Sequence, residues 1–103
     1  MKYRTTAAFD RDFARLPAQH QRLFATAVHG YFLPAIGAGA FTGSPPWPTR
    51  LRIHRLHGTN VYSLTWSFSS PDGRATFHLA SDDAGDAMLV WSRIGNHRIY
   101  DRP

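Results

Sequence analysis

The sequence predicts an α+β domain in which two N-terminal helices pack on one face of a small antiparallel sheet. Apolar residues recur with helical spacing between residues 9 and 32, and from residue 50 onward they alternate with a period of two. A segment rich in glycine and proline, residues 34–49, separates these two patterns. A run of helices followed by a run of strands is typical of α+β domains, so we expect the order strand, helix, helix and then four strands.

Length and composition limit the class of protein. The chain has 103 residues, which suits a single domain spanning residues 1–103, and 43% of them are hydrophobic, enough to form a core. It contains no cysteine, which excludes a disulfide framework and any cysteine-ligated metal centre. No stretch resembles a membrane span or a secretory signal, so we expect a soluble, cytoplasmic protein.

The N-terminal half predicts a short strand followed by two helices. Lys2–Thr6 is the candidate strand, and Thr5 or Thr6 can cap the first helix. Pro17 ends this helix and opens the second, which we expect to end at Pro34. The solvent side of the first helix is expected to take Asp10, Arg11, Asp12 and Arg15.

The C-terminal half predicts an antiparallel meander of four strands whose apolar sides face the helices. Each strand alternates apolar and polar side chains, and each turn contains glycine with asparagine, aspartate or proline. The expected strands are residues 51–54, Tyr62–Phe68, Arg74–Ala80 and Ala87–Ile94, joined by turns at Gly58–Asn60, Ser69–Gly73 and Ser81–Asp86.

The sheet face turned away from the helices is expected to be an open polar surface. Small hydroxyl side chains would lie at its centre, with arginine and histidine around them. Its expected members are Arg52, His54, Ser63, Thr65, Ser67, Arg74, Thr76 and His78. Such a surface could hold a phosphodiester backbone, and an ordinary solvated sheet face fits the same pattern equally well.

The charge balance favours an anionic partner. Twelve lysines and arginines oppose seven acidic residues, giving a net charge of +5, and eleven of the twelve cations are arginine. Residues 50–57 hold three arginines and two histidines with no acid. Because the guanidinium fork binds phosphate through paired hydrogen bonds, this segment is a candidate contact to nucleic acid, although arginine also serves solubility.

Candidate acid–base groups lie near the C-terminus, in the ending Arg93-Ile94-Gly95-Asn96-His97-Arg98-Ile99-Tyr100. The imidazole of a histidine such as His97 titrates near neutral pH and can therefore donate or accept a proton. Together with the order of elements, the basic strand before a hairpin and the small size, this ending resembles the RelE/ParE superfamily of toxins from bacterial type II toxin–antitoxin systems. The resemblance covers nearly the whole chain as an element pattern. It implies a RelE-like fold and a metal-independent endoribonuclease that cleaves mRNA, usually in the ribosomal A site. It also implies an antitoxin protein that neutralises the toxin.

The resemblance assigns catalytic roles to His97 and Tyr100, and Arg52 and His54 match the basic pair of the family. Candidate phosphate-binding residues are Arg50, Arg55, Arg74, Arg93 and Arg98. Two features depart from RelE-like enzymes: Ser63 occupies a position where they usually carry arginine, and the chain has no glutamate.

Two other function classes stay open. A ParE-like member would inhibit DNA gyrase without cleaving RNA, and a RelE-fold protein without toxicity would only bind RNA or a protein. The missing arginine at position 63 favours these alternatives, whereas the His97 and Tyr100 ending favours the nuclease. We expect neither a cofactor nor a metal site, because His54 and His57 point to opposite faces of a strand.

Overall fold

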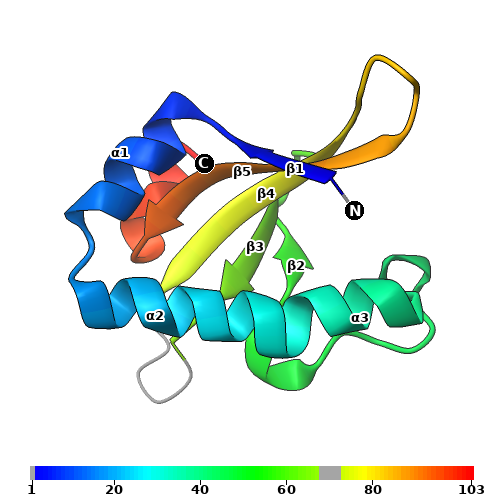
Figure 1. The fold of residues 1–103 in the computed structure, drawn as a ribbon, viewed down its shortest axis with the longest axis horizontal. Coiled ribbons are helices and arrows are strands. Elements are labelled where there is room, and N and C mark those ends of the chain that lie inside the picture. The colour runs from blue at the N-terminus through cyan, green and yellow to red at the C-terminus, as the bar shows by residue number, and fades with distance from the viewer. Residues whose placement is uncertain (1, 68–72) are drawn as a thin grey trace.

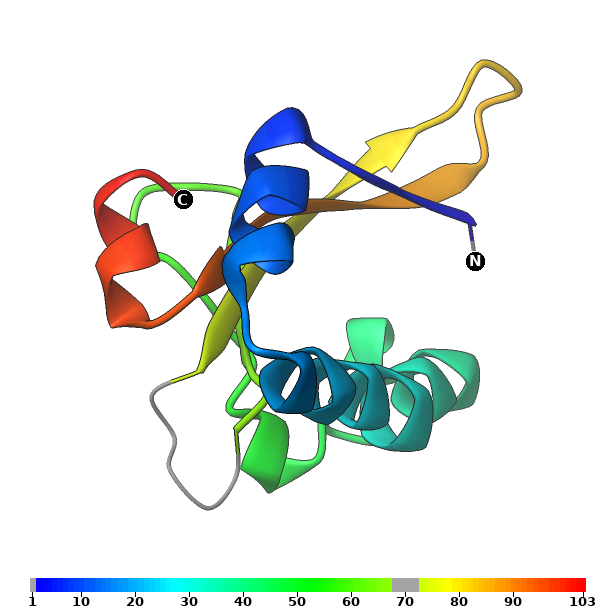
Figure 2. The same ribbon diagram turned by 60° about the vertical axis from the view of Figure 1, so that its left-hand side comes forward.

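A computed structural model describes residues 2–67 and 73–103 and shows an α+β protein with two helical arms and a five-stranded mixed sheet (Figure 1). The strands are β1 (Lys2–Thr5), β2 (His54–Arg55), β3 (Tyr62–Thr65), β4 (Arg74–Ser81) and β5 (Ala87–Gly95). The helical elements are α1 (Ala7–Arg15), α2 (Ala18–Ala27), the π-helical turn η1 (Val28–Phe32), α3 (Leu33–Ala38) and the 3₁₀ turns η2 (Ala40–Thr42), η3 (Thr49–Leu51) and η4 (His97–Asp101). Figure 2 shows the α2–α3 arm and η4 on opposite sides of the sheet.

The sheet has the order β1-β5-β4-β3-β2, and its first pair is parallel. β1 pairs with β5 from Lys2 opposite Met88 to Thr5 opposite Trp91, whereas the other neighbouring strands are antiparallel. The prediction of a purely antiparallel sheet was therefore wrong. Alternation along a strand marks its buried face, but it carries no information about the direction of a partner more than 80 positions away.

Three of the four meander strands lie close to their predicted places, as β3, β4 and β5. Tyr62 of β3 stacks on Phe77 of β4 with ring centroids 5.5 Å apart, as expected for side chains on one face of paired strands. Phe68 and most of the turn predicted at Ser69–Gly73 lie outside the described residues.

The first meander strand is much shorter than predicted. Thr49–Leu51 forms η3, and Arg52 adopts a left-handed conformation with φ of 47°. Only His54–Arg55 then pairs with β3. Leu51 is fully buried, so the chain turns its apolar side chain into the core with a helical turn instead of an extended strand.

Helix α1 begins where the sequence predicts. Thr6 is the N-cap: its Oγ1 accepts a hydrogen bond of 3.1 Å from the Phe9 N–H. The same hydroxyl donates to the Ser92 carbonyl oxygen of β5 at 2.7 Å. The Thr6 side chain therefore supplies a hydrogen-bond partner for a free N–H group at the start of α1 and also joins this helix to the sheet.

The second helical arm continues past Pro34, which was predicted to end it. α2, η1 and α3 follow one another without a break, and the arm ends at Gly39 with φ of 103°. In η1 the helix widens, and the Leu33 N–H bonds to the carbonyl of Val28 five positions back. Pro34 then lies in the first turn of α3, where its missing N–H costs little, so the widened turn accommodates the proline.

The core lies between the α2–α3 arm and one face of the sheet. Phe32, Phe77 and Trp91 contact one another with ring centroids 5.1–5.5 Å apart, and Phe32 and Phe77 are fully buried. Trp47, from the glycine- and proline-rich connector, stacks on Phe32 at 5.4 Å. Burial of each such aromatic side chain contributes roughly 1.5–3 kcal/mol, so this cluster fixes the helical arm against the sheet.

Candidate functional site

The polar face of the sheet is covered by the C-terminal segment, defined here as residues 96–103. Ser63, Thr65 and Thr76 have 0%, 1% and 0% of their surface exposed. The prediction of an open Ser/Thr-lined groove was therefore wrong. After Gly95 the chain folds back across the sheet, and the hydroxyl groups of Ser63 and Thr76 bind the returning segment instead of facing solvent.

Several contacts anchor the C-terminal segment. The Thr76 hydroxyl donates to the main-chain oxygen of Pro103 at 3.0 Å, and Ile99 is 6% exposed against the sheet. Asn96 caps η4, because its side-chain oxygen accepts from the Arg98 N–H at 2.9 Å. Gly95 allows the close approach: a Cβ at this position would lie 3.1 Å from the Ile99 methyl group.

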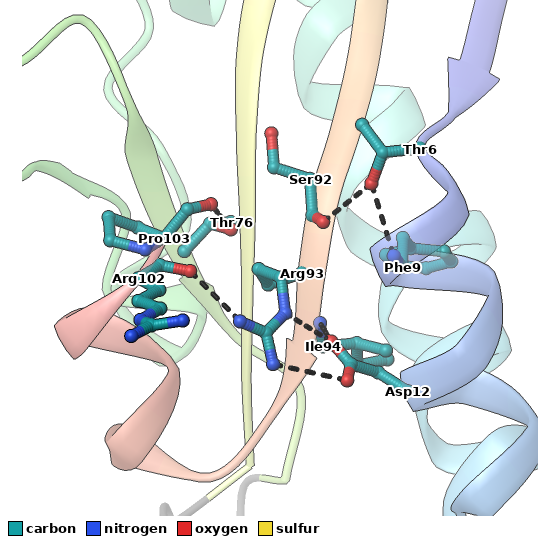
Figure 3. A network of polar contacts seen from close by, with 9 residues as sticks. All are labelled: Thr6, Phe9, Asp12, Thr76, Ser92, Arg93, Ile94, Arg102 and Pro103. Carbon is teal, nitrogen blue, oxygen red and sulfur yellow. Dashed lines mark hydrogen bonds and ion pairs between the residues drawn. The ribbon is translucent and has the colours of Figure 1, made fainter.

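Arg93 connects this segment to α1 (Figure 3). Its Nε donates to Asp12 Oδ2 at 2.6 Å, its Nη2 to Asp12 Oδ1 at 3.2 Å, and its Nη1 to the Arg102 carbonyl oxygen at 3.0 Å. The hydrogen bond that Arg93 donates to the Asp12 carboxylate raises the pKa of Arg93. Asp12 also accepts from the Ile94 N–H at 3.2 Å, so it faces β5 and not solvent, contrary to the prediction.

The side chains of Tyr100, Ser63 and His54 meet at the end of the polar face, and we refer to them as the Tyr100 cluster. The Tyr100 and Ser63 hydroxyl oxygens lie 2.6 Å apart. The His54 ring stands nearly perpendicular to the Tyr100 ring, with centroids 6.3 Å apart. His54 Nδ1 lies 3.0 Å from the Arg52 carbonyl oxygen, a distance at which a protonated ring nitrogen donates a hydrogen bond.

The structure thus brings together three of the four predicted catalytic residues: Tyr100 and His54 by their rings, and Arg52 by its main chain. His97 begins η4, three positions before Tyr100, and the position of its imidazole lies outside what the structure describes.

The predicted phosphate-binding arginines lie in several places. Arg55 on β2 and Arg98 on η4 are exposed neighbours of the Tyr100 cluster in sequence. Arg50 instead stacks over the Tyr31 ring at 4.9 Å and donates to its hydroxyl at 2.8 Å. Arg74 is half-buried on β4, and Arg93 is bound to Asp12. Arg93 could therefore contact a phosphate only in competition with a carboxylate.

Sequence reasoning missed the parts played by Ser63 and Asp12. Ser63 was placed on an open face and Asp12 on the wet side of α1, because their partners are 37 and 81 positions away. The alternation of β3 did predict that Ser63 shares a face with His54 and Thr76, and the strand pairings confirm this; it gave no sign that Tyr100 would cover that face.

A cavity of about 470 Å³ lies elsewhere, between α1, the α2–α3 arm and the β1–β5 pair. Its lining is mainly apolar and includes Phe9, Phe13, Phe24, Val28 and Leu33. Within residues 2–67 and 73–103, no three metal-ligating side chains are grouped closely enough to hold an ion. In the same residues no helix is long and apolar enough to cross a bilayer.

Comparisons with protein-family models, with curated proteins and with solved structures found no match to this chain.

Proposed function

We propose that the protein is a RelE-like toxin of a type II toxin–antitoxin system, a metal-independent endoribonuclease acting on mRNA in the cytoplasm. The observation that carries this proposal is the Tyr100 cluster, where a phenol 2.6 Å from a buried serine stands beside an imidazole. A phenol and an imidazole are groups that can move protons in a phosphoryl transfer.

The proposed reaction is an internal transfer within the RNA. A ribose 2′-hydroxyl loses its proton and its oxygen attacks the adjacent phosphorus, while the bond from phosphorus to the 5′-oxygen breaks and that oxygen gains a proton. The products are a 2′,3′-cyclic phosphate and a 5′-hydroxyl end. His54 and His97 are the candidate proton-transfer groups, and Tyr100 is the candidate for orienting or protonating an oxygen.

Cationic side chains around the Tyr100 cluster would hold the RNA. Arg98 is exposed on η4, which carries Tyr100, and Arg52 is exposed two residues before His54. Arg55 is also exposed, but it follows His54 directly on β2 and therefore points to the other face of that strand. The guanidinium groups of Arg52 and Arg98 can stabilise the charge that develops on the phosphate oxygens. Because the C-terminal segment covers the centre of the polar face, the RNA would bind at its end.

The apolar cavity supports the second part of the proposal, a neutralising antitoxin. Tyr3 at its rim is 68% exposed and Leu33 is 40% exposed, which favours a protein partner over a small polar ligand. The net charge of +5 favours an acidic partner, so the antitoxin segment would be apolar on one side and acidic on the other.

Induced expression tests the nuclease directly. Wild-type protein should stop growth and produce new mRNA 5′ ends within minutes, and Tyr100→Phe and His97→Ala should each abolish most of these ends. His29→Ala is the matched control, because it removes an exposed imidazole from η1, on the opposite side of the sheet.

A gyrase supercoiling assay on the same purified proteins separates the alternatives. Arrested cells with intact mRNA and inhibited gyrase would establish the ParE-like function and end the nuclease proposal. Normal growth with intact mRNA would leave only a binding protein.

A further inference from the structure

We propose that Ser63 is a positioning residue for Tyr100: it holds the phenol oxygen at the place where the RNA reacts. This inference rests on the proposed nuclease function. It assigns a role to the residue at which the chain departs from the RelE-like pattern, and the role is to act on a neighbouring side chain instead of on phosphate.

The location of Ser63 makes it a rigid support. It lies on β3, paired with His54 of β2 on one side and with Thr76 of β4 on the other. Thr76 is in turn opposite Arg93 of β5, so Ser63 belongs to a row of four residues across four strands, all on the same face. Ser63 itself is 0% exposed, and strands on both sides fix its main chain.

Tyr100 needs such a support. It belongs to η4, a short 3₁₀ turn that lies on the sheet, and its side chain is half-buried. A tyrosine ring in that setting can rotate about two bonds, which would carry the hydroxyl group through several ångströms. The hydrogen bond of 2.6 Å to the Ser63 hydroxyl selects one of these positions. The serine oxygen is itself well fixed, because only rotation about the Cα–Cβ bond can move it.

The burial of Ser63 also favours this hydrogen bond. A serine hydroxyl without access to water needs a protein partner, because an unsatisfied buried hydroxyl is costly. The Tyr100 hydroxyl supplies that partner, and the ring of His54 stands beside it. The hydrogen bond thus couples the fixed sheet to a group that can reach the RNA.

The test is a double-mutant cycle between Ser63 and Tyr100. The measured quantity is the single-turnover rate at which the protein cleaves an mRNA bound to programmed ribosomes. Ser63→Ala should lower the rate at saturating protein by about five- to tenfold, the effect expected for one lost hydrogen bond. The protein concentration giving half the maximal rate should change less than twofold, since Ser63 does not touch RNA. Ser63→Thr, which keeps a hydroxyl group, should recover most of the rate.

The decisive comparison uses Tyr100→Phe as background. Ser63→Ala should have no further effect there, because the hydroxyl group that it positions is absent. Thr76→Val is the matched control: it removes the other buried hydroxyl that anchors the C-terminal segment, and its effect should be the same in both backgrounds. Independent, multiplicative effects of Ser63→Ala and Tyr100→Phe would overturn the proposal.

A second measurement does not depend on activity. The ring NMR signals of Tyr100 in the free protein should shift and broaden in Ser63→Ala and stay close to wild type in Thr76→Val. If wild-type protein cleaves no RNA, the nuclease proposal fails, and these signals still report whether Ser63 holds the phenol. Unchanged Tyr100 signals in a folded Ser63→Ala protein would refute the positioning role.

Discussion

At the scale of single residues, the pair of Asp12 and Arg93 joins helix α1 to strand β5 across 81 positions of the sequence. The carboxylate accepts from both the guanidinium group and the Ile94 N–H, and the guanidinium group also reaches the Arg102 carbonyl. The side chains of Asp12 and Arg93 are 12% and 27% exposed, so the pair is only partly screened by solvent. A charge-assisted, two-pronged pair of this kind contributes more than an ordinary surface ion pair.

Asp12→Asn should therefore reduce the free energy of unfolding by about 1–2 kcal/mol, measured by urea denaturation at neutral pH. The amide keeps the shape of the carboxylate but removes its charge and one acceptor oxygen. Asp10→Asn is the matched control, because Asp10 is exposed on the same helix. Equal stabilities of the two variants would show that the pair with Arg93 contributes nothing measurable.

His97→Ala should lower RNA cleavage by at least about 100-fold, within the usual range for a general acid or base. The expectation comes from an imidazole that begins η4, three residues before Tyr100. Rates on programmed ribosomes give the measurement, with His57→Ala as an imidazole control in the turn after β2. A loss smaller than threefold would remove His97 from the mechanism.

At the scale of elements, local pattern was sufficient wherever neighbours in sequence determine the structure. The Thr6 cap and strands β3, β4 and β5 follow from spacing and turn residues, and all were predicted. The continuation of the helical arm past Pro34 was not predicted, because it depends on the widened turn η1. The η3 turn likewise depends on burial of Leu51, which no local pattern reveals.

The candidate site was predicted less well than the fold. The resemblance to RelE-like toxins singled out His54, Arg52 and Tyr100, which the structure brings together. Nothing local indicated that the C-terminal segment covers the polar face, since that depends on contacts such as Tyr100 with Ser63, 37 positions apart. The sequence named candidate groups, and only the tertiary structure shows which of them are already bound to other side chains.

Gly73→Ala tests packing at the start of β4. A Cβ at this position would lie 2.7–2.8 Å from three ring atoms of Trp66, which is 3% exposed. The indole would have to shift within a filled core, so we expect a loss of about 1–3 kcal/mol in the free energy of unfolding. Gly30→Ala, where the added Cβ meets nothing within 4 Å, is the control, and a Gly73→Ala protein as stable as this control would contradict the packing.

At the scale of the whole molecule, Lys2 joins the first strand to the turn between β4 and β5. Its Nζ donates to Asp82 Oδ2 at 2.9 Å, and this hydrogen bond is the main cause that lowers the pKa of Asp82 below its ordinary value of 3.8. The N–H groups of Ala84 and Asp86 donate to the other carboxylate oxygen. The carboxylate therefore also shapes the turn.

The sign of the resulting pH dependence follows from the lowered pKa. The unfolded chain takes up a proton on Asp82 at a higher pH than the folded protein does. The stabilisation is thus present above the ordinary pKa and is lost as the pH falls through the folded one. Asp82→Asn should flatten the acid side of the stability curve between about pH 5 and pH 2, measured by urea denaturation. If wild type and variant lose stability in parallel over that range, Asp82 makes no contribution.

Helix α1 lines the apolar cavity on one side and contacts Arg93 of β5 on another. Phe9 and Phe13 line the apolar cavity, while Asp12, on the same helix, holds Arg93 and through it the C-terminal segment. A ligand that displaces α1 from the cavity side must therefore alter the support of η4, which carries Tyr100. On the proposed function, a cavity partner that weakens RNA binding at Tyr100 would itself be bound more weakly, by the same factor, in the presence of RNA. Inhibition would then require no direct obstruction of the RNA site.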